Sequence, residues 1–333
     1  MHPQKESQSK FFKALEHSGG YDAVLQETMA VLGLRKGAVY KRMNGDTALT
    51  TAELVALSNH FNFSLDDNLL DGKFISFTHP FMQEGDTKNI DFLRSISTYL
   101  ETLRSKEKSK LTYLANELPL FYYISRRYIF TFLMSIWNHL HWEEGALKIN
   151  ETAHLDENIE SFRTEITDYY DAHPVTEIWN SNMMSNLYQQ VIFCITIRAF
   201  DNVSFVQHLM NDIKNLITHL KDITLHGIRK SSNSDEQVDL SIYLNEFGNY
   251  LNVLLYEGED LDITFIAFDY PQFIKTNSSG FNQYSKKWIE KLKKRSVLIS
   301  SAGYQYRELF FLKQEKDFEA FKEKAENLLK VYY

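Results

Sequence analysis

Cysteine is almost missing from this chain of 333 residues, since Cys194 is the only one. A single cysteine excludes an internal disulfide and a four-cysteine zinc site, and it favours a reducing compartment. Long hydrophobic runs are also missing, because the apolar stretches 128–137 and 191–197 fall well short of the ~20 residues that cross a bilayer. The segment 1–10 has no apolar core of a signal peptide. We therefore expect a cytoplasmic protein with no membrane partner.

Sequence patterns of catalysis and of cofactor binding are lacking too. The chain has no glycine-rich phosphate loop, and His139 and His141 do not have the His-Glu-x-x-His spacing of a zinc site. The carboxylates between 156 and 168 are dense enough to favour a solvated helix face over a catalytic pair. Cys194 lies in an apolar segment, which predicts a buried and inert thiol. We expect no enzyme activity, no catalytic residue, no metal and no cofactor.

Positive charge is scarce overall but concentrated at the start of the chain. The net charge is −8, whereas residues 1–50 contain seven Lys or Arg against five Asp or Glu, a net of +2. The remaining 283 residues therefore carry −10. An acidic body with a basic head is the distribution expected when only the head meets phosphate.

Four helices are predicted in the first part of the chain from apolar spacing and from caps. Their expected ranges are about 7–17, 21–32, 35–43 and 50–61. Gly33 ends the second helix, and Asn44-Gly45 closes the third with a signal for left-handed backbone. Thr50, with Glu53 three residues later, is a candidate capping box for the fourth. We place the first domain at 1–85.

The rest of the chain is expected to be helical as far as residue 248 and mixed beyond it. Helices are predicted at about 90–104, 111–118, 122–141, 155–170, 176–200, 203–225 and 238–247. After these, 249–268 reads as a β-hairpin through Gly258, and a short strand at 296–300 is expected between helices at 281–294 and 305–330. The expected fold is mainly α, with a helical domain at 86–248, open to a tetratricopeptide-like arrangement, and an α+β portion at 249–333.

The stretch GLRKGAVYKRMNG, residues 33–45, has the layout of a tight turn followed by a recognition helix. Val39 and Met43 are four residues apart and are expected to bury one face of that helix. The opposite face then carries the candidate DNA-binding residues Arg35, Lys36, Gly37, Tyr40, Lys41 and Arg42. Long cationic side chains donate to guanine edges or to phosphates, and a glycine permits close approach to DNA.

This stretch is followed by residues 50–70, which fit the next helix and the end of a small domain. Together they resemble the helix-turn-helix of Cro and the phage repressors, and the resemblance covers about residues 7–70. The resemblance implies sequence-specific binding of double-stranded DNA, with Lys36, Tyr40 and Lys41 at base edges and Arg35 and Arg42 at phosphates. Two positions depart from that pattern, since Met29 and Arg35 stand where small residues are usual. The alternative is a protein-interaction scaffold whose head has the same fold but no longer binds DNA.

Three further stretches, 113–124, 243–246 and 294–311, resemble segments of a family of Bacteroidetes transcription regulators with an N-terminal helix-turn-helix. The resemblance implies transcription regulation and names no ligand. We expect a homodimer, because one small module makes few phosphate contacts. The domain order is similar to that of peptide-sensing regulators, so a peptide or another small molecule is the expected effector.

Amide side chains cluster in segments predicted to be helical. Rows of them on an inner helix face can hydrogen-bond an extended peptide, whereas the alternative is surface asparagine with no such role. The candidate effector-binding residues are Asn182, Asn186, Gln189, Asn245 and Asn249.

Overall fold

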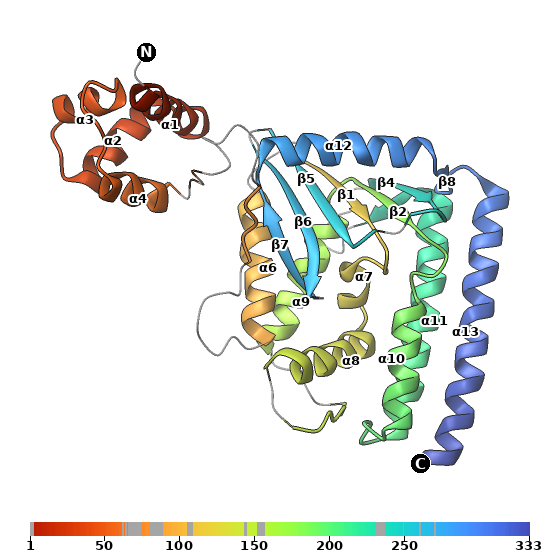
Figure 1. Cartoon of the computed structure of the whole chain (residues 1–333). Helices are drawn as coiled ribbons and strands as arrows, with labels where there is room; N and C mark the ends of the chain where they lie inside the picture. Colours follow the sequence, from red (N-terminus) through yellow and green to blue (C-terminus); the bar gives the residue numbers. More distant parts are fainter. Residues whose placement is uncertain are drawn as a thin grey trace. The chain divides into compact units, whose positions relative to one another are not determined.

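The fold is described from a computed structural model, shown in Figure 1. It describes residues 3–61, 63, 65, 75–79, 89–104, 109–142, 145–151, 157–230, 237–248, 250–259, 261–269 and 271–333. The chain divides into two compact units. Residues 1–78 together with 276–283 form the N-terminal unit, and residues 79–275 together with 284–333 form the C-terminal unit. Most residues in regular elements are helical, as predicted.

The N-terminal unit contains the four predicted helices. They are α1 (Pro3–Gly19), α2 (Tyr21–Leu32), α3 (Lys36–Met43) and α4 (Thr51–His60). Apolar residues that recur every three or four positions bury one face of each helix in a common core. The buried members of this core are Phe11, Phe12, Leu15, Val24, Leu25, Val39, Met43 and Leu57. The capping box is confirmed, because the Thr50 side chain accepts from the amide of Glu53 while the Glu53 carboxylate accepts from the amide of Thr50.

The C-terminal unit is built on a mixed sheet with the strand order β3-β4-β2-β1-β5-β6-β7, and β8 pairs with β4. The strands are β1 (Lys110–Leu114), β2 (Val175–Trp179), β3 (Ile228–Lys230), β4 (Gln237–Leu244), β5 (Val253–Glu257), β6 (Asp262–Asp269), β7 (Gln272–Thr276) and β8 (Val297–Leu298). Strands β1, β2 and β4 are mutually parallel. Strand β5 pairs antiparallel with β1 and with β6, and the hairpin predicted around Gly258 is thereby confirmed.

Helices cover both faces of this sheet (Figure 1). They are α6 (Asn89–Arg104), α7 (Leu120–Ile124), α8 (Arg127–Trp137), a π-helical turn η1 (Asn138–Trp142), α9 (Glu157–Asp171), α10 (Ser185–Thr196), α11 (Val203–His226), α12 (Ser279–Lys294) and α13 (Tyr304–Tyr332). Ile289 of α12 packs on one face against Leu114 and Ile178. The larger core lies on the other face and contains Leu111 and Tyr113.

Two predicted helices are wrong and a third is wrong in its first part, because strands occupy these segments. The region 111–118 contains β1, the region 176–200 begins with β2 before α10, and the region 238–247 contains β4. Strands β1 and β2 bury side chains on both faces, so they lack the alternation of a half-exposed strand. Short apolar runs of this kind cannot be told from helix by their period alone. The helices predicted near 90–104, 155–170, 203–225, 281–294 and 305–330 are confirmed.

The structure does not separate residues 86–248 from 249–333. Strands β1, β2 and β4 precede residue 248, strands β5, β6 and β7 follow it, and all six belong to one sheet. The helices between α6 and α11 are interrupted by β1 and β2 and pack on that sheet, which differs from the stacked helical pairs of a tetratricopeptide array.

Candidate functional site

A turn of three residues joins α2 to α3, and Gly33 begins it. Gly33 has φ 63°, in the left-handed region that glycine adopts without strain. The amides of Gly33 and Leu34 both donate to the carbonyl of Met29. On α3, Val39 is 0% exposed and Met43 is 5% exposed, so this face of the helix packs into the N-terminal core. The opposite face of α3 is left to the solvent.

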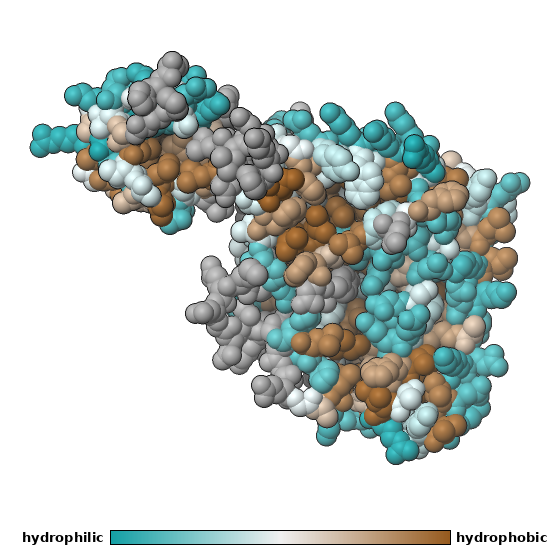
Figure 2. Space-filling view, viewed as in Figure 1, coloured by the Kyte–Doolittle hydropathy of each residue, from teal (hydrophilic) through white to brown (hydrophobic). Residues whose placement is uncertain are grey.

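The outer face of α3 brings together five of the six predicted DNA-binding residues. Arg35, Lys36, Gly37 and Lys41 are exposed and Tyr40 is half-buried. The Nζ of Lys36 lies 5.5 Å from the centroid of the Tyr40 ring, within the range of a cation–π contact. Arg35 precedes α3 without making a side-chain cap, as its departure from the usual small residue predicts. Figure 2 shows hydrophilic residues over the part of the N-terminal unit where α3 lies.

Gly37 is exposed to solvent on the outer face of α3. A Cβ added at this position would meet no atom within 4 Å. Gly37 is the second residue of α3, and the empty space beside it belongs to the outer surface of this helix.

Arg42 is placed differently from the prediction that it contacts phosphate. Its Nη2 and Nε lie 2.8 and 3.1 Å from one carboxylate oxygen of Glu53, and both side chains are mostly buried. The hydrogen bond from Arg42 is the largest cause that lowers the pKa of Glu53. The second oxygen of Glu53 caps α4. Arg42 therefore fixes α3 to the start of α4, and it leaves the set of groups available to DNA.

Gln8 is a second residue that holds α3 in place, and no pattern in the sequence predicts this role. It lies on α1 and is 7% exposed. Its Nε2 donates to the carbonyls of Arg42 and Thr47 at 2.6 and 2.8 Å, and its Oε1 accepts from the amide of Leu49 at 2.9 Å. Lys5 adds an ion pair to Asp46 at 3.0 Å. Contacts from α1 thus hold the backbone between the end of α3 and the start of α4.

Two of the asparagines predicted to line a helix face, Asn182 and Asn245, lie in loops at the carboxyl ends of the parallel strands. Asn182 follows β2, and its Oδ1 accepts from Lys313 at 3.2 Å. Asn245 follows β4, is 3% exposed, donates to Ser296 and accepts from two amides of its own loop. The predicted row on a helix is wrong for these two residues, because β2 and β4 occupy the segments that were expected to be helical.

The remaining amide candidates are not brought together with them. Asn186 and Gln189 lie on α10 and are exposed, and Asn186 donates to Glu117 at 3.1 Å. Asn249 lies outside the described residues. Two asparagines outside the predicted set are more central: Asn180 donates to the carbonyl of Ala115 at 3.1 Å, and Asn252 accepts from two amides of the loop after β1. Their amide groups are used to connect loops.

A carboxylate in β2 is buried in the core of the C-terminal unit. Glu177 is 0% exposed and accepts from the hydroxyls of Tyr122 and Tyr170 at 2.8 Å and from Nε1 of Trp179 at 2.7 Å. Burial raises the pKa of Glu177, against the opposing effect of Arg229. Because the carboxylate is sealed from solvent, the arrangement is one that fixes the core.

Arg229 lies beside this carboxylate and is equally buried. Its Nη2 donates to the carbonyls of Tyr170 and His173 at 2.8 Å, and its guanidinium lies 4.3 Å from the centroid of the Tyr170 ring. Asp171 is 3.6 Å away, and burial raises the pKa of this carboxyl to about 6. The thiol of Cys194 is buried as predicted, and burial raises its pKa to about 12.

No protein-family model matches the chain, and neither a curated protein nor a solved structure is significantly similar to it. Across the part of the chain that the structure describes, no helix combines the length and the apolar character that crossing a membrane requires.

Proposed function

We propose that this protein is a sequence-specific DNA-binding transcription regulator whose N-terminal unit is a helix-turn-helix and whose α3 enters the major groove. The observation that supports this proposal is the outer face of α3. It presents Arg35, Lys36, Gly37, Tyr40 and Lys41 together on a short helix that is fixed by contacts on its other side. A rigid helix with an exposed cationic face is what reading of base edges requires.

Each residue of this face has a specific part in the proposal. Lys36, Tyr40 and Lys41 reach base edges, where cationic groups donate to guanine N7 and O6. Arg35, at the start of α3, contacts a phosphate of the DNA backbone. Gly37 lets the helix axis approach the bases closely, since no side chain stands between them. Arg42 has no direct part, because Glu53 binds its guanidinium.

The working form of the regulator in this proposal is a homodimer. One α3 contacts only a few base pairs, whereas two copies about 34 Å apart read both halves of a palindromic site. The C-terminal unit supplies the dimer contact and the binding of a peptide or small-molecule effector.

The experiment is a fluorescence-anisotropy titration of the full chain with the duplex upstream of its own gene and with a scrambled duplex. A Lys36→Ala/Lys41→Ala variant is compared with a Lys316→Ala/Lys324→Ala variant, which removes the same charge from exposed positions of α13. We expect at least a tenfold preference for the upstream duplex, which the α3 variant loses and the α13 variant keeps. The affinity should fall with salt, and less steeply for the α3 variant.

Folded protein that binds no duplex, or that binds every duplex equally, would overturn this proposal in favour of a protein-interaction scaffold. Equal losses in the two double variants would also contradict it, because they would trace binding to overall charge. Selection of bound sequences from a random duplex pool covers the case in which the operator lies elsewhere in the genome, and failure to enrich any sequence there is decisive against the proposal.

A further inference from the structure

Positive charge after residue 50 is concentrated on α12, which packs on the sheet through Ile289. Residues 279–295 contain six Lys or Arg against one Glu, a net of +5. The rest of the chain after residue 50 carries −15. Figure 2 shows hydrophilic residues along α12. This helix is therefore a basic segment on an acidic body, and clustered cations on one helix are typical of a surface that meets phosphates.

Two of the cations on α12 are used within the chain. The Nζ of Lys286 lies 2.8 Å from a carboxylate oxygen of Asp262 and 3.1 Å from one of Glu257. The Nζ of Lys293 lies 2.9 Å from the carboxylate of Glu290. These lysines connect α12 to the hairpin of β5 and β6 and to its own preceding turn.

The side chains of Lys287, Lys291 and Arg295 form a second set, called here the basic row. All three are exposed, and none of these side chains makes a hydrogen bond or an ion pair within the part of the chain that the structure describes. Positions four residues apart lie on the same side of an α-helix, at steps of about 6 Å along its axis. The basic row therefore presents three cations on one side of α12 and directly after its end. Lys294 is exposed as well.

Like charges at this spacing weaken a helix. Two cations four residues apart destabilise it by about 0.2–0.5 kcal/mol, and the basic row contains two such pairs. Attraction to the helix dipole offsets this repulsion only in the last turn, so it does not account for Lys287 in the middle of α12. A polyanion beside the row would replace this repulsion by attraction.

The charges of α13 have the arrangement of an ordinary solvated helix. Residues 304–332 contain six Lys or Arg and six Asp or Glu. Lys313 pairs with Asp317 at 2.6 Å, and Lys322 pairs with Glu326 at 4.0 Å. Opposite charges four residues apart stabilise a helix, whereas the basic row repeats one sign. Contact with solvent alone therefore does not require the composition of α12.

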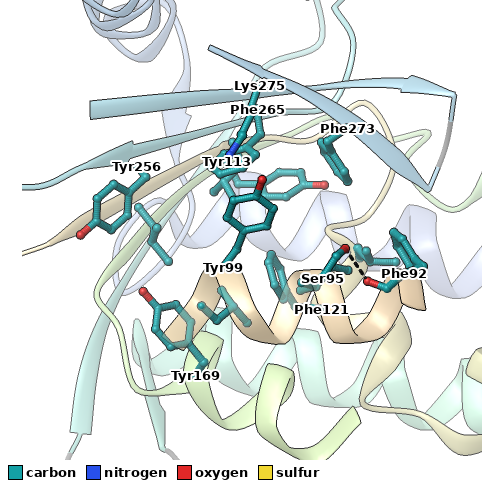
Figure 3. A pocket seen from close by; sticks show the side chains of 15 residues that line it. Phe92, Ser95, Tyr99, Tyr113, Phe121, Tyr169, Tyr256, Phe265, Phe273 and Lys275 are labelled. Atoms are coloured by element: carbon teal, nitrogen blue, oxygen red, sulfur yellow. Dashed lines mark hydrogen bonds between the residues drawn. The ribbon is translucent and has the colours of Figure 1, made fainter. Parts of the chain in front are cut away.

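The helix α6 shows that packing on the sheet does not require a basic helix either. An apolar pocket with mainly aromatic walls lies between α6 and the sheet (Figure 3). Within it, Tyr99 of α6 meets Phe265 of β6 edge-to-face, with the ring centroids 6.3 Å apart. Residues 89–104 contain two Arg, one Asp and one Glu. Both α6 and α12 thus pack on the sheet through apolar side chains, and only α12 combines this with an excess of one charge.

The inner face of α12 indicates which polyanion fits the basic row. Ile289 is buried, and Trp288 and Leu292 pack against the same core. A helix that lies on a membrane inserts its apolar face into the lipid, and in α12 this face is occupied by the sheet. Duplex DNA requires cations alone, because it carries one negative charge for about every 1.7 Å of its length. A row about 12 Å long lies within reach of several phosphates.

We propose that the basic row, together with Lys294, binds the phosphates of double-stranded DNA without regard to sequence, as a contact additional to that of α3. Phosphates carry no sequence information, so this contact adds affinity and leaves the preference for one sequence to α3. The choice of DNA as the polyanion rests on the proposed function, whereas the position and the sign of the charge do not. The contact involves α12 from Lys287 onward.

The first test titrates two triple variants of the full chain with the scrambled duplex at several salt concentrations. The α12 variant changes the basic row to glutamine (Lys287→Gln/Lys291→Gln/Arg295→Gln). The α13 variant changes three exposed lysines in the same way and so lowers the net charge equally (Lys316→Gln/Lys324→Gln/Lys330→Gln).

We expect the α12 variant to bind the scrambled duplex at least tenfold more weakly than the wild-type protein. The slope of log affinity against log salt should become shallower by about 2–3, because three phosphate contacts are lost. The α13 variant should change its affinity less than twofold. Full binding by the α12 variant, or equal losses in the two variants, would overturn the proposal.

Two further measurements keep the test independent of folding in the triple variant. Lys287→Arg/Lys291→Arg retains the charge and should bind as the wild-type protein does; a loss as large as that of the glutamine variant would contradict a contact with phosphates. Acetylation of the wild-type protein, read by mass spectrometry, should show the scrambled duplex protecting Lys287 and Lys291 at least threefold, with the lysines of α13 unchanged. Protection confined to the lysines of α3 would contradict the proposal.

Vesicles of phosphatidylserine test the membrane as the alternative partner. If the wild-type protein binds them through the basic row while the α12 variant keeps its duplex affinity, the row serves a membrane and the proposal is wrong. If the α12 variant weakens binding of the upstream and the scrambled duplex alike and neither is preferred, the proposed function fails while this inference stands. If the upstream duplex is preferred and the α12 variant binds as the wild-type protein does, this inference alone fails.

Discussion

The outer face of α3 in the N-terminal unit and the core of the C-terminal unit use their polar side chains in opposite ways. In the N-terminal unit, Lys36 and Lys41 project from α3 into solvent. In the C-terminal unit, Glu177, Arg229 and Asn245 are turned inward and bind groups of the same chain. In the sequence alone, the two groups look alike, because each consists of polar residues within helical or apolar segments. Their different environments become visible only when the partners in space are known.

This difference shows which polar groups are available to another molecule. A buried polar group needs partners, since an unpaired one costs about 1–3 kcal/mol, so its partners define its role within the fold. An exposed cation has no such need, because water solvates it. Arg42 and Lys41 are neighbours in sequence, yet Arg42 binds Glu53 of the same chain whereas Lys41 is exposed to solvent.

The largest effect is expected for Glu177→Ala. It leaves the hydroxyls of Tyr122 and Tyr170 and the indole of Trp179 without their acceptor, and Arg229 without its neighbouring carboxylate. We expect the free energy of unfolding of the C-terminal unit to fall by about 3–5 kcal/mol. All four tryptophans lie in this unit, so urea unfolding followed by tryptophan fluorescence reports it alone.

Glu177→Gln is the matched control for that change. The amide keeps one oxygen as an acceptor, so a loss of about 1–3 kcal/mol is expected. Equal losses for alanine and glutamine would mean that the charge matters and the hydrogen bonds do not. Loss of less than about 1 kcal/mol in both would contradict the view that this carboxylate organises the core.

The raised pKa of Asp171 predicts that the stability of the C-terminal unit depends on pH. The pKa of this residue is about 6 in the folded chain against 3.8 for an unperturbed aspartate. Because the folded chain binds this proton more tightly than the unfolded chain, protonated Asp171 stabilises the fold. This contribution to the free energy of unfolding is fully present below pH 3.8 and is lost as the pH rises through 6. The loss corresponds to about 3 kcal/mol, at 1.36 kcal/mol for each pH unit.

Asp171→Asn should therefore gain about 3 kcal/mol relative to the wild-type protein between pH 4 and pH 7. The measurement is urea unfolding at several pH values, followed by tryptophan fluorescence. Asp201→Asn, at an exposed position, is the control and should change little with pH. A constant difference between Asp171→Asn and the wild-type protein across this range would contradict the expected titration.

A substitution at Gly37 tests whether the outer face of α3 serves an external ligand or the fold of the N-terminal unit. Gly37→Leu adds a side chain into open space and improves helix propensity, so we expect unchanged or slightly higher thermal stability. The same side chain would stand between α3 and the bases. Duplex affinity should fall at least tenfold, which corresponds to about 1.4 kcal/mol. Gly280→Leu, at another exposed helical glycine with no atom within 4 Å, is the control and should keep its affinity.

Full duplex binding by Gly37→Leu would show that α3 does not approach DNA along this face. Loss of binding together with loss of folding, measured by circular dichroism, would instead place Gly37 among the residues that the fold requires. The two readouts separate an outward role from an inward one at a single position.

Local features were predictable from the sequence, and contacts across the chain were not. Gly33 and the capping box of Thr50 and Glu53 act within a few residues, so their spacing reveals them. Gln8 acts on carbonyls 34 and 39 residues away, and no pattern in the sequence links them. The outward set on α3 was predictable because helix periodicity fixes its faces, except for Arg42, whose partner lies on α4.

The C-terminal unit was less predictable because its inner strands β1 and β2 are buried on both faces. In β2, all five residues are buried, and Glu177 stands in the middle of an apolar run. Only the parallel partners β1 and β4 show that this run is an inner strand. The aromatic pocket has the same origin, because its walls come from elements as far apart as Phe92 and Phe273.

The smallest expected effect concerns the N-terminal cap of α4, which was predicted from the sequence and is present in the structure. Thr50→Ala removes the acceptor of the Glu53 amide at the start of α4 and should cost the N-terminal unit about 1 kcal/mol. Thr51→Ala, one position further and without a cap, should be neutral or slightly stabilising, since alanine favours helix. Amide hydrogen exchange of α1 to α4 measures the change, and tryptophan fluorescence should not move in either variant. A loss in Thr51→Ala as large as that in Thr50→Ala would show that the cap is not what holds α4. If Thr50→Ala lowers both the exchange protection of α1 to α4 and the stability reported by tryptophan fluorescence, the two units unfold together. The two units would then differ in how their polar side chains are used and would share one stability.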